Sequence, residues 1–291
     1  MNTYIWLIRR EFWENRAIWI VPAVIGVALT VAALFGRIDF GLAISAEQKR
    51  MIGPTVLLPY EFTFFAVMSI YSSWYLMECL YADRKDRSVL FWKSLPISDT
   101  ATVLAKLFIG VIAIPLVYFL VADVSTLLLA FIVSMRAQAY LGSVLWQPEL
   151  WLQLHVLWLY VIVTTGIWFL PFTGWLLLVS AWAKRAVMLW LVLPPLALYG
   201  AEHWFFGSDV FGSQLTERAL GYLPRAFYGQ SNSSAWATTA IGTDAITVPS
   251  SVWHLLNPIG FLSSPATWVG VLVGAAMIYG AIQLRLRRAE T

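Results

Sequence analysis

The chain has 291 residues, of which 60% are apolar and only 12% are charged. Soluble proteins average roughly 45–50% apolar and about 25% charged residues, so this composition excludes an ordinary soluble globule. A mean hydropathy of +0.73 agrees with a chain that has the bilayer as its solvent. The net charge of +3 comes from short basic clusters beside apolar runs, which indicates membrane topology rather than nucleic-acid binding.

The scarcity of reactive side chains excludes several kinds of site. Cys79 is the single cysteine, so the chain cannot form an internal disulfide. His155, His203 and His254 lie far apart in the sequence, and no metal site is predicted from them. We expect His155 and His203 to be ordinary polar residues near the outer membrane interface.

The N-terminal residues 1–16 alternate apolar and charged side chains, a pattern typical of a short helix lying in the cytoplasmic interface. The apolar run 17–35 follows directly. It is longer than the apolar core of a typical signal peptide, and no clear small-x-small cleavage site ends it. The sequence therefore predicts an uncleaved first membrane span.

Six apolar stretches are predicted to cross the membrane, because about 20 residues of helix cover roughly 30 Å of hydrocarbon. In chain order they are 17–35, about 55–77, about 107–134, 150–183, 186 to about 206, and about 266–284. The prediction is an all-α integral membrane fold with six transmembrane helices in a single domain over residues 1–291.

Residues 207–265 are predicted to be extracytoplasmic. They hold a stretch rich in Ser, Thr and Gly over 229–244, followed by an apolar stretch over 245–262 that Pro249 and Pro258 interrupt. This pattern favours short re-entrant or surface helices before the last span rather than a further full span.

The distribution of lysine and arginine predicts the orientation, because cytoplasmic flanks carry an excess of both. With six spans, most of the 19 basic residues fall on the face that holds both termini, the loop over 81–106 and the turn between spans four and five. We therefore expect both termini to be cytoplasmic.

Three acids, Glu61, Glu78 and Asp123, lie in or beside the predicted spans, where an ionised side chain is costly, and all three are candidates for the translocation path. Glu61 lies near the outer end of span two. Glu78 lies about one turn before the charged loop, so we expect it to reach cytoplasmic water or to pair with Arg84 or Lys85. Asp123 is the deepest of the three and is either a substrate or proton contact in the translocation path, or a hydrogen-bonded packing or outer-leaflet residue.

The loop between spans two and three carries the functional signal. It leaves span two through Asp83-Arg84-Lys85-Asp86-Arg87, and a short helix predicted from Ser88 ends at Pro96. Ser98 or Asp99 can then cap the helix that becomes span three. Apolar residues on this short cytoplasmic helix indicate either a protein partner or simple anchoring in lipid headgroups.

This loop resembles that of the permease subunits of type-2 ABC exporters, the ABC-2 family, in its charged run, short helix, Leu95-Pro96-Ile97-Ser98 turn and downstream Lys106. The resemblance implies a coupling helix that docks on a separate ATPase. The implied docking residues are Asp83, Arg84, Asp86, Arg87, Val89, Phe91, Trp92 and Leu95. Where the family often has glycine, this chain has Ser88.

The resemblance also implies the partners. Two copies of an ATPase subunit would carry ATP and Mg, since this chain lacks a Gly-x-x-x-x-Gly-Lys-Ser/Thr phosphate loop and has no cofactor or catalytic site of its own. A second permease chain, identical or different, would complete a dimer in the bacterial inner membrane. The substrate would be amphipathic or hydrophobic, such as a peptide, an antibiotic or a lipid.

Two other classes of protein remain as alternatives. A secondary transporter could use Asp123, and a non-catalytic membrane scaffold would need none of these residues, but neither accounts for residues 83–99 as well. A membrane-embedded enzyme is disfavoured, because no His/Asp/Glu cluster or Ser/Lys pair is visible within the predicted spans.

Overall fold

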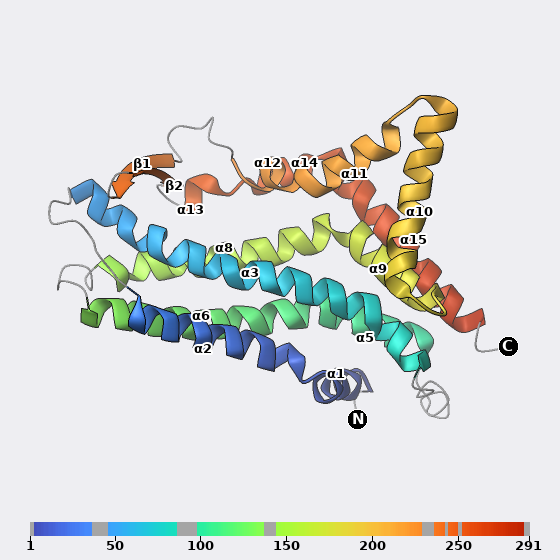
Figure 1. Ribbon diagram of the computed structural model, residues 1–291, viewed down its shortest axis with the longest axis horizontal. Coiled ribbons are helices and arrows are strands. Elements are labelled where there is room, and N and C mark those ends of the chain that lie inside the picture. Colours follow the sequence, from blue (N-terminus) through green and yellow to red (C-terminus); the bar gives the residue numbers. More distant parts are fainter. Residues whose placement is uncertain are drawn as a thin grey trace.

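The computed structural model describes residues 3–36, 46–85, 98–136, 144–228, 236–241, 244–249 and 252–287. These residues are helical apart from one two-stranded hairpin (Figure 1). Among them, four helical segments are long and apolar enough to cross a membrane: Ala17–Phe35, Asp99–Arg136, Pro148–Trp168 and Pro265–Arg287. The prediction of a helical, multi-pass membrane protein is therefore confirmed.

The first two helices meet at an abrupt turn. Helix α1, Thr3–Glu14, and helix α2, Ala17–Phe35, are separated by two residues. In Figure 1, α1 is seen nearly end-on while α2 runs along the view, so the chain changes direction between them. An amphipathic helix that turns away from the first apolar helix has the geometry of an interfacial element.

The longest helix is α3, Ala46–Lys85, with 40 residues. Beside it runs a segment of three consecutive parts, which are α5 (Asp99–Phe108), the π-helical turn η1 (Ile109–Ala113) and α6 (Ile114–Arg136). Ser98 caps the N-terminus of α5, because its side chain accepts a hydrogen bond from the Ala101 backbone N–H at 3.1 Å.

The π-helical turn has an identifiable cause. Ile114 donates its backbone N–H to the Ile109 carbonyl, five residues earlier. In that register the next donor would be Pro115, which has no N–H, so the carbonyl of Gly110 loses its partner within the helix. Ser72 of α3 replaces it with a hydroxyl hydrogen bond of 2.8 Å.

The apolar stretch 150–183, predicted as one span, is divided into two helices. Helix α8 covers Pro148–Trp168 and α9 covers Leu170–Trp182, separated at Phe169. Pro171 in the first turn of α9 accounts for the break, because proline cannot donate the backbone hydrogen bond that would continue α8. Helix α10, Val187–Ala201, and the π-helical turn η2, Glu202–Phe206, follow after a sharp turn at Ala186.

Between α10 and the last helix the chain forms four short helices and a hairpin. The helices are α11 (Val210–Leu220), α12 (Tyr222–Ala226), α13 (Val252–Leu255) and α14 (Pro258–Ser263). Strands β1, Trp236–Ile241, and β2, Asp244–Pro249, pair antiparallel with Thr238 opposite Thr247. The expectation of helices over 245–262 was therefore wrong at its start, where Thr, Ile and Val in β2 favour a strand.

The last helix, α15 (Pro265–Arg287), crosses α9 at very short range. A side chain at Gly174 would meet the Gly274 carbonyl at 2.8 Å, and one at Gly274 would meet the Leu170 backbone at 2.7 Å. Gly174 and Gly274, one on each helix, therefore permit the close approach of the α9 and α15 backbones.

The helix ends are sorted between the two ends of the molecule (Figure 1). The end of α3, the start of α5, the turn between α9 and α10, and both termini lie toward the right of the view, and we call this region the loop end of the bundle. The opposite ends of α2, α3 and α6 lie far from it, on the left, near the hairpin.

Candidate functional site

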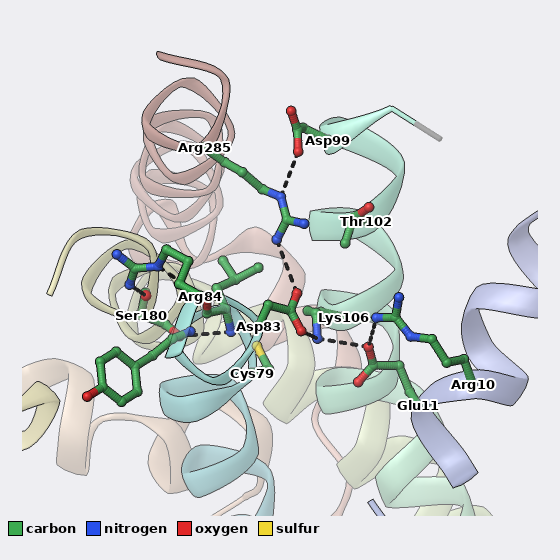
Figure 2. A network of polar contacts seen from close by, with 12 residues as sticks. Arg10, Glu11, Cys79, Asp83, Arg84, Asp99, Thr102, Lys106, Ser180 and Arg285 are labelled. Atoms are coloured by element: carbon green, nitrogen blue, oxygen red, sulfur yellow. Dashed lines mark hydrogen bonds and ion pairs between the residues drawn. The ribbon is translucent and has the colours of Figure 1, made fainter. Parts of the chain in front are cut away.

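A buried ionic network lies at the loop end of the bundle, where α3 stops and α5 begins (Figure 2). Arg285 of α15 joins both sides of this break. Its guanidinium donates to Asp99 at 2.7 Å and to Asp83 at 3.3 Å. One side chain from the last helix thus holds the two residues that bracket loop 86–97.

Lys106 extends the network to the N-terminal helix. Its ammonium donates to Glu11 of α1 at 2.8 Å and to Asp83 of α3 at 3.2 Å. Lys106 is 2% exposed and Glu11 is 1% exposed, so both charges have lost nearly all contact with solvent. A buried ammonium is retained only where acids compensate it, and here two acids from different helices do so.

Glu11 is the most heavily bonded member of the network. Besides Lys106, it accepts hydrogen bonds from Arg10 at 2.7 Å and from the Tyr75 hydroxyl at 2.8 Å. Burial opposes ionisation of this carboxyl, but the charges of Lys106 and Arg10 outweigh that effect and hold the pKa of Glu11 below its ordinary value. The Glu11 carboxylate is therefore charged at neutral pH.

Arg84, next to Asp83, faces the other side of α3. Its guanidinium donates to the backbone carbonyls of Ser180 and Ala183 at the end of α9, the latter at 2.9 Å. The Ser180 hydroxyl in turn accepts from the backbone N–H of Leu80 at 3.1 Å. The last turn of α3 is thereby fixed to α9 as well as to α1, α5 and α15.

The charges of the network link helices α1, α3, α5 and α15. Its acids are all neutralised by lysine or arginine. No group of three or more His, Cys, Asp or Glu that could hold a metal ion occurs in the part of the chain that the structure describes. Removing one charge from such a network leaves another buried and unpaired, which costs about 3–5 kcal/mol.

The structure places only part of the predicted docking set. Asp83 and Arg84 are both described, and both are engaged by other helices of the same chain. The other six lie outside the described residues: Asp86, Arg87, Val89, Phe91, Trp92 and Leu95. The described network therefore fixes the two bases of the predicted coupling loop.

A second polar cluster lies farther along the bundle and brings together two of the three predicted intramembrane acids. Glu61 of α3 accepts from the Thr126 hydroxyl and from the Trp158 indole N–H, each at 2.6 Å. One turn from Thr126 on α6, Asp123 lies 3.2 Å from the Nε2 atom of His155 on α8. Glu78 is separate from this cluster, on an exposed part of α3.

The hydrogen bonds of His155 define its tautomer. Its Nδ1 atom lies 2.7 Å from the Trp151 carbonyl, which can only accept, so Nδ1 carries a proton. The Nε2 atom faces the Asp123 carboxyl at 3.2 Å. Asp123 and His155 thus form a polar pair between α6 and α8.

The cluster of Glu61, Asp123 and His155 lies at the height of the middle of the apolar helix α2. Ser125, two residues after Asp123, packs against Gly26, which lies halfway along α2 and has no room for a side chain. Asp123 and His155 nevertheless keep side-chain exposures of 27% and 40%. A partly exposed polar pair beside the middle of an apolar helix requires water or protein next to it, because lipid would leave the pair unsolvated.

Several members of both clusters were missed from the sequence. Glu11, Asp99, Lys106 and Arg285 were assigned to the interface, a helix cap or topology, and His155 was expected to be an ordinary polar residue. A signal was present for Lys106 and Glu11, since each stands among apolar neighbours at helical spacing. No sequence signal pairs Arg285 with Asp83, because the two are joined only by the tertiary fold.

Comparison with known proteins adds no family: no protein-family model, curated protein or solved structure matches this chain.

Proposed function

We propose that this chain is the membrane-spanning permease subunit of an ATP-driven exporter of the type-2 ABC class. The observation that carries the proposal is the bracket formed by Asp83 and Asp99 around loop 86–97, with Arg285 bonded to both. A loop held at both bases by buried ion pairs can pass a force from a docked partner directly into α1, α3, α5 and α15. A loop that only anchors the chain in headgroups has no need of such a joint.

The proposed topology has six spans with both termini in the cytoplasm of a bacterial inner membrane. The proposed topology adds two spans to the four helical segments described above. One lies within α3, and the other is α10 with η2, which together cover 187–206 and reach about 30 Å at about 1.5 Å per residue. Helices α8 and α9 then form one bent span. The basic residues gathered at the loop end support a cytoplasmic position for that end.

The energy source belongs to another chain in this proposal. Two ATPase subunits carrying ATP and Mg dock on a dimer of permease chains, and their closure moves the loop. Phe91 and Trp92 make the apolar contact with the ATPase, while Asp83 and Arg84 hold the base of the loop against the other helices. The transported molecule is amphipathic or hydrophobic, as suits the many apolar and aromatic residues of the spans.

The experiment is co-purification with an ATPase encoded beside this gene, followed by ATPase and transport assays. Phe91→Ala/Trp92→Ala should abolish association and transport. A matched aromatic control is Trp204→Ala/Phe205→Ala, an exposed pair at the far end of α10 from the loop. The control should leave ATPase association intact. If the Phe91/Trp92 variant keeps both association and transport, the docking assignment is wrong.

The topology has its own test. After Cys79→Ser removes the single cysteine, a cysteine placed at Ser88 should react with a membrane-impermeant reagent only from the cytoplasmic side. Labelling of Ser88→Cys from outside intact cells would overturn the proposed orientation, whatever the result of the ATPase experiment.

A secondary carrier is the second candidate, and the polar pair of Asp123 and His155, 3.2 Å apart, is the observation that favours it. A carrier would be driven by an ion gradient and would need no ATPase. Collapse of the proton gradient with ATP maintained would stop a carrier and leave an ABC exporter running. Asp123→Asn should abolish transport if the protein is a carrier, and should leave ATP-driven transport running if it is an ABC exporter.

A further inference from the structure

Helix α1 has two faces with different partners. The inner face carries Leu7, which is 4% exposed, and Glu11, which belongs to the ionic network. The outer face carries Trp6, Arg9 and Trp13, which are exposed and lie in one stripe along the helix at spacings of three and four residues. The exposed Arg16 follows in the turn between α1 and α2, and we call these four residues the stripe.

The arginines of this stripe differ from their neighbour Arg10 in what they bind. Arg10 turns inward and pairs with Glu11 at 2.7 Å. The Arg9 guanidinium instead lies between two indole rings, 5.4 Å from the centre of Trp6 and 4.8 Å from that of Trp13. Within the described chain, neither Arg9 nor Arg16 has a carboxylate partner, so their charges are available to an outside anion.

The position of the stripe identifies that anion. Helix α1 lies at the start of the apolar helix α2 (Figure 1). In the proposed topology, where α2 spans the bilayer, the outer face of α1 is at the level where the bilayer meets water. Tryptophan rings favour the headgroup layer, and a guanidinium binds phosphate oxygens through several N–H donors at once. We propose that Trp6, Arg9, Trp13 and Arg16 bind the phosphate of an anionic lipid headgroup.

Lipid binding at this stripe acts on the ionic network through the helix itself. Glu11, on the opposite face of the same helix, is the residue that α1 presents to Lys106. A headgroup that holds Arg9 and Arg16 fixes α1 across the bundle and so favours the Glu11–Lys106 contact. The inference concerns the lipid surface alone and does not depend on which energy source drives transport.

The test is native mass spectrometry of the full-length protein in detergent, titrated with phosphatidylglycerol or phosphatidylcholine. Wild type should bind phosphatidylglycerol more tightly. Arg9→Gln/Arg16→Gln should weaken that binding at least about fivefold, the effect of roughly one basic residue at an anionic surface, and leave phosphatidylcholine binding unchanged. Unchanged phosphatidylcholine binding also shows that the variant is folded.

Arg185→Gln is the matched control, because Arg185 is exposed in the turn between α9 and α10, at the same loop end of the bundle. It should keep wild-type affinity. Three results would overturn the proposal: no lipid preference in wild type, an equal loss in the control, or full retention in the double variant. Displacement of the lipid by inorganic phosphate at constant ionic strength would also overturn it, because the ligand would then be a free anion.

Discussion

Lys106→Met is the sharpest test of the buried network. Methionine has a similar shape but removes the ammonium that joins Glu11 and Asp83 at 2.8 and 3.2 Å. Both acids are buried; Asp83 retains Arg285, and Glu11 retains Arg10 and the Tyr75 hydroxyl. Breaking a buried pair from one side costs about 3–5 kcal/mol, so the free energy of unfolding should fall by that amount.

The assay is reversible unfolding in detergent micelles, followed by circular dichroism, for a double-mutant cycle. Glu11→Gln added to Lys106→Met removes the acid whose ion pair with Lys106 the first change breaks. The double variant should therefore lose less stability than the sum of the single variants, with an interaction energy of roughly 0.5–3 kcal/mol. Additive losses, or a loss below about 1 kcal/mol for Lys106→Met, would show that the network does not hold the helices together.

Three further outcomes follow from the contacts. The pKa of the Glu11 carboxyl is lowered in the folded protein, so its ion pairs should stabilise the fold fully at pH values above 4.5, the ordinary pKa of a glutamate. This stabilisation should disappear as the pH falls through the lower pKa of the folded state. Thermal melts from pH 7 to pH 3 should show the loss in wild type and not in Glu11→Gln. Gly274→Leu should cost about 1–3 kcal/mol or more by forcing α15 from α9, whereas Gly200→Ala, with nothing within 4 Å, should be neutral or stabilising in the same unfolding assay. Ser72→Ala should cost about 1–3 kcal/mol, because the Gly110 carbonyl loses its only described donor, and hydrogen exchange should rise around η1. Equal melts of wild type and Glu11→Gln would contradict the Glu11 ion pairs, and equal stabilities of the Gly274→Leu and Gly200→Ala variants would contradict the close α9–α15 contact. Unchanged hydrogen exchange in Ser72→Ala would contradict the Ser72–Gly110 hydrogen bond.

Composition and apolar length were enough to predict a helical membrane protein, because a span must satisfy every backbone group within itself. Local chemistry also predicted the cap at Ser98, since its hydroxyl needs only the backbone two or three residues ahead. Pro171 predicted a kink in the apolar stretch 150–183, but not its division into two helices at Phe169. Pro171 was visible in the sequence, but tertiary packing decides whether proline bends a helix or divides it.

The candidate sites were predicted less completely for a different reason. Asp83, Glu61 and Asp123 could be singled out because a charge beside apolar residues is conspicuous in any sequence. Their partners could not be assigned, since Arg285 lies about 200 positions after Asp83 and reaches it only once α15 has packed on the bundle.

The two polar clusters lie on one continuous helical segment. Lys106 belongs to the network at the loop end, and Asp123 lies 17 residues further along, about 25 Å at about 1.5 Å per residue. Between them stands η1, where the backbone has left the α-helical register and Ser72 of α3 holds the freed carbonyl. The proposed function requires movement at the loop to reach the membrane interior, and this segment is the direct covalent path. A π-helical turn with a side-chain hydrogen bond in place of a backbone one is the point on that path where bending costs least.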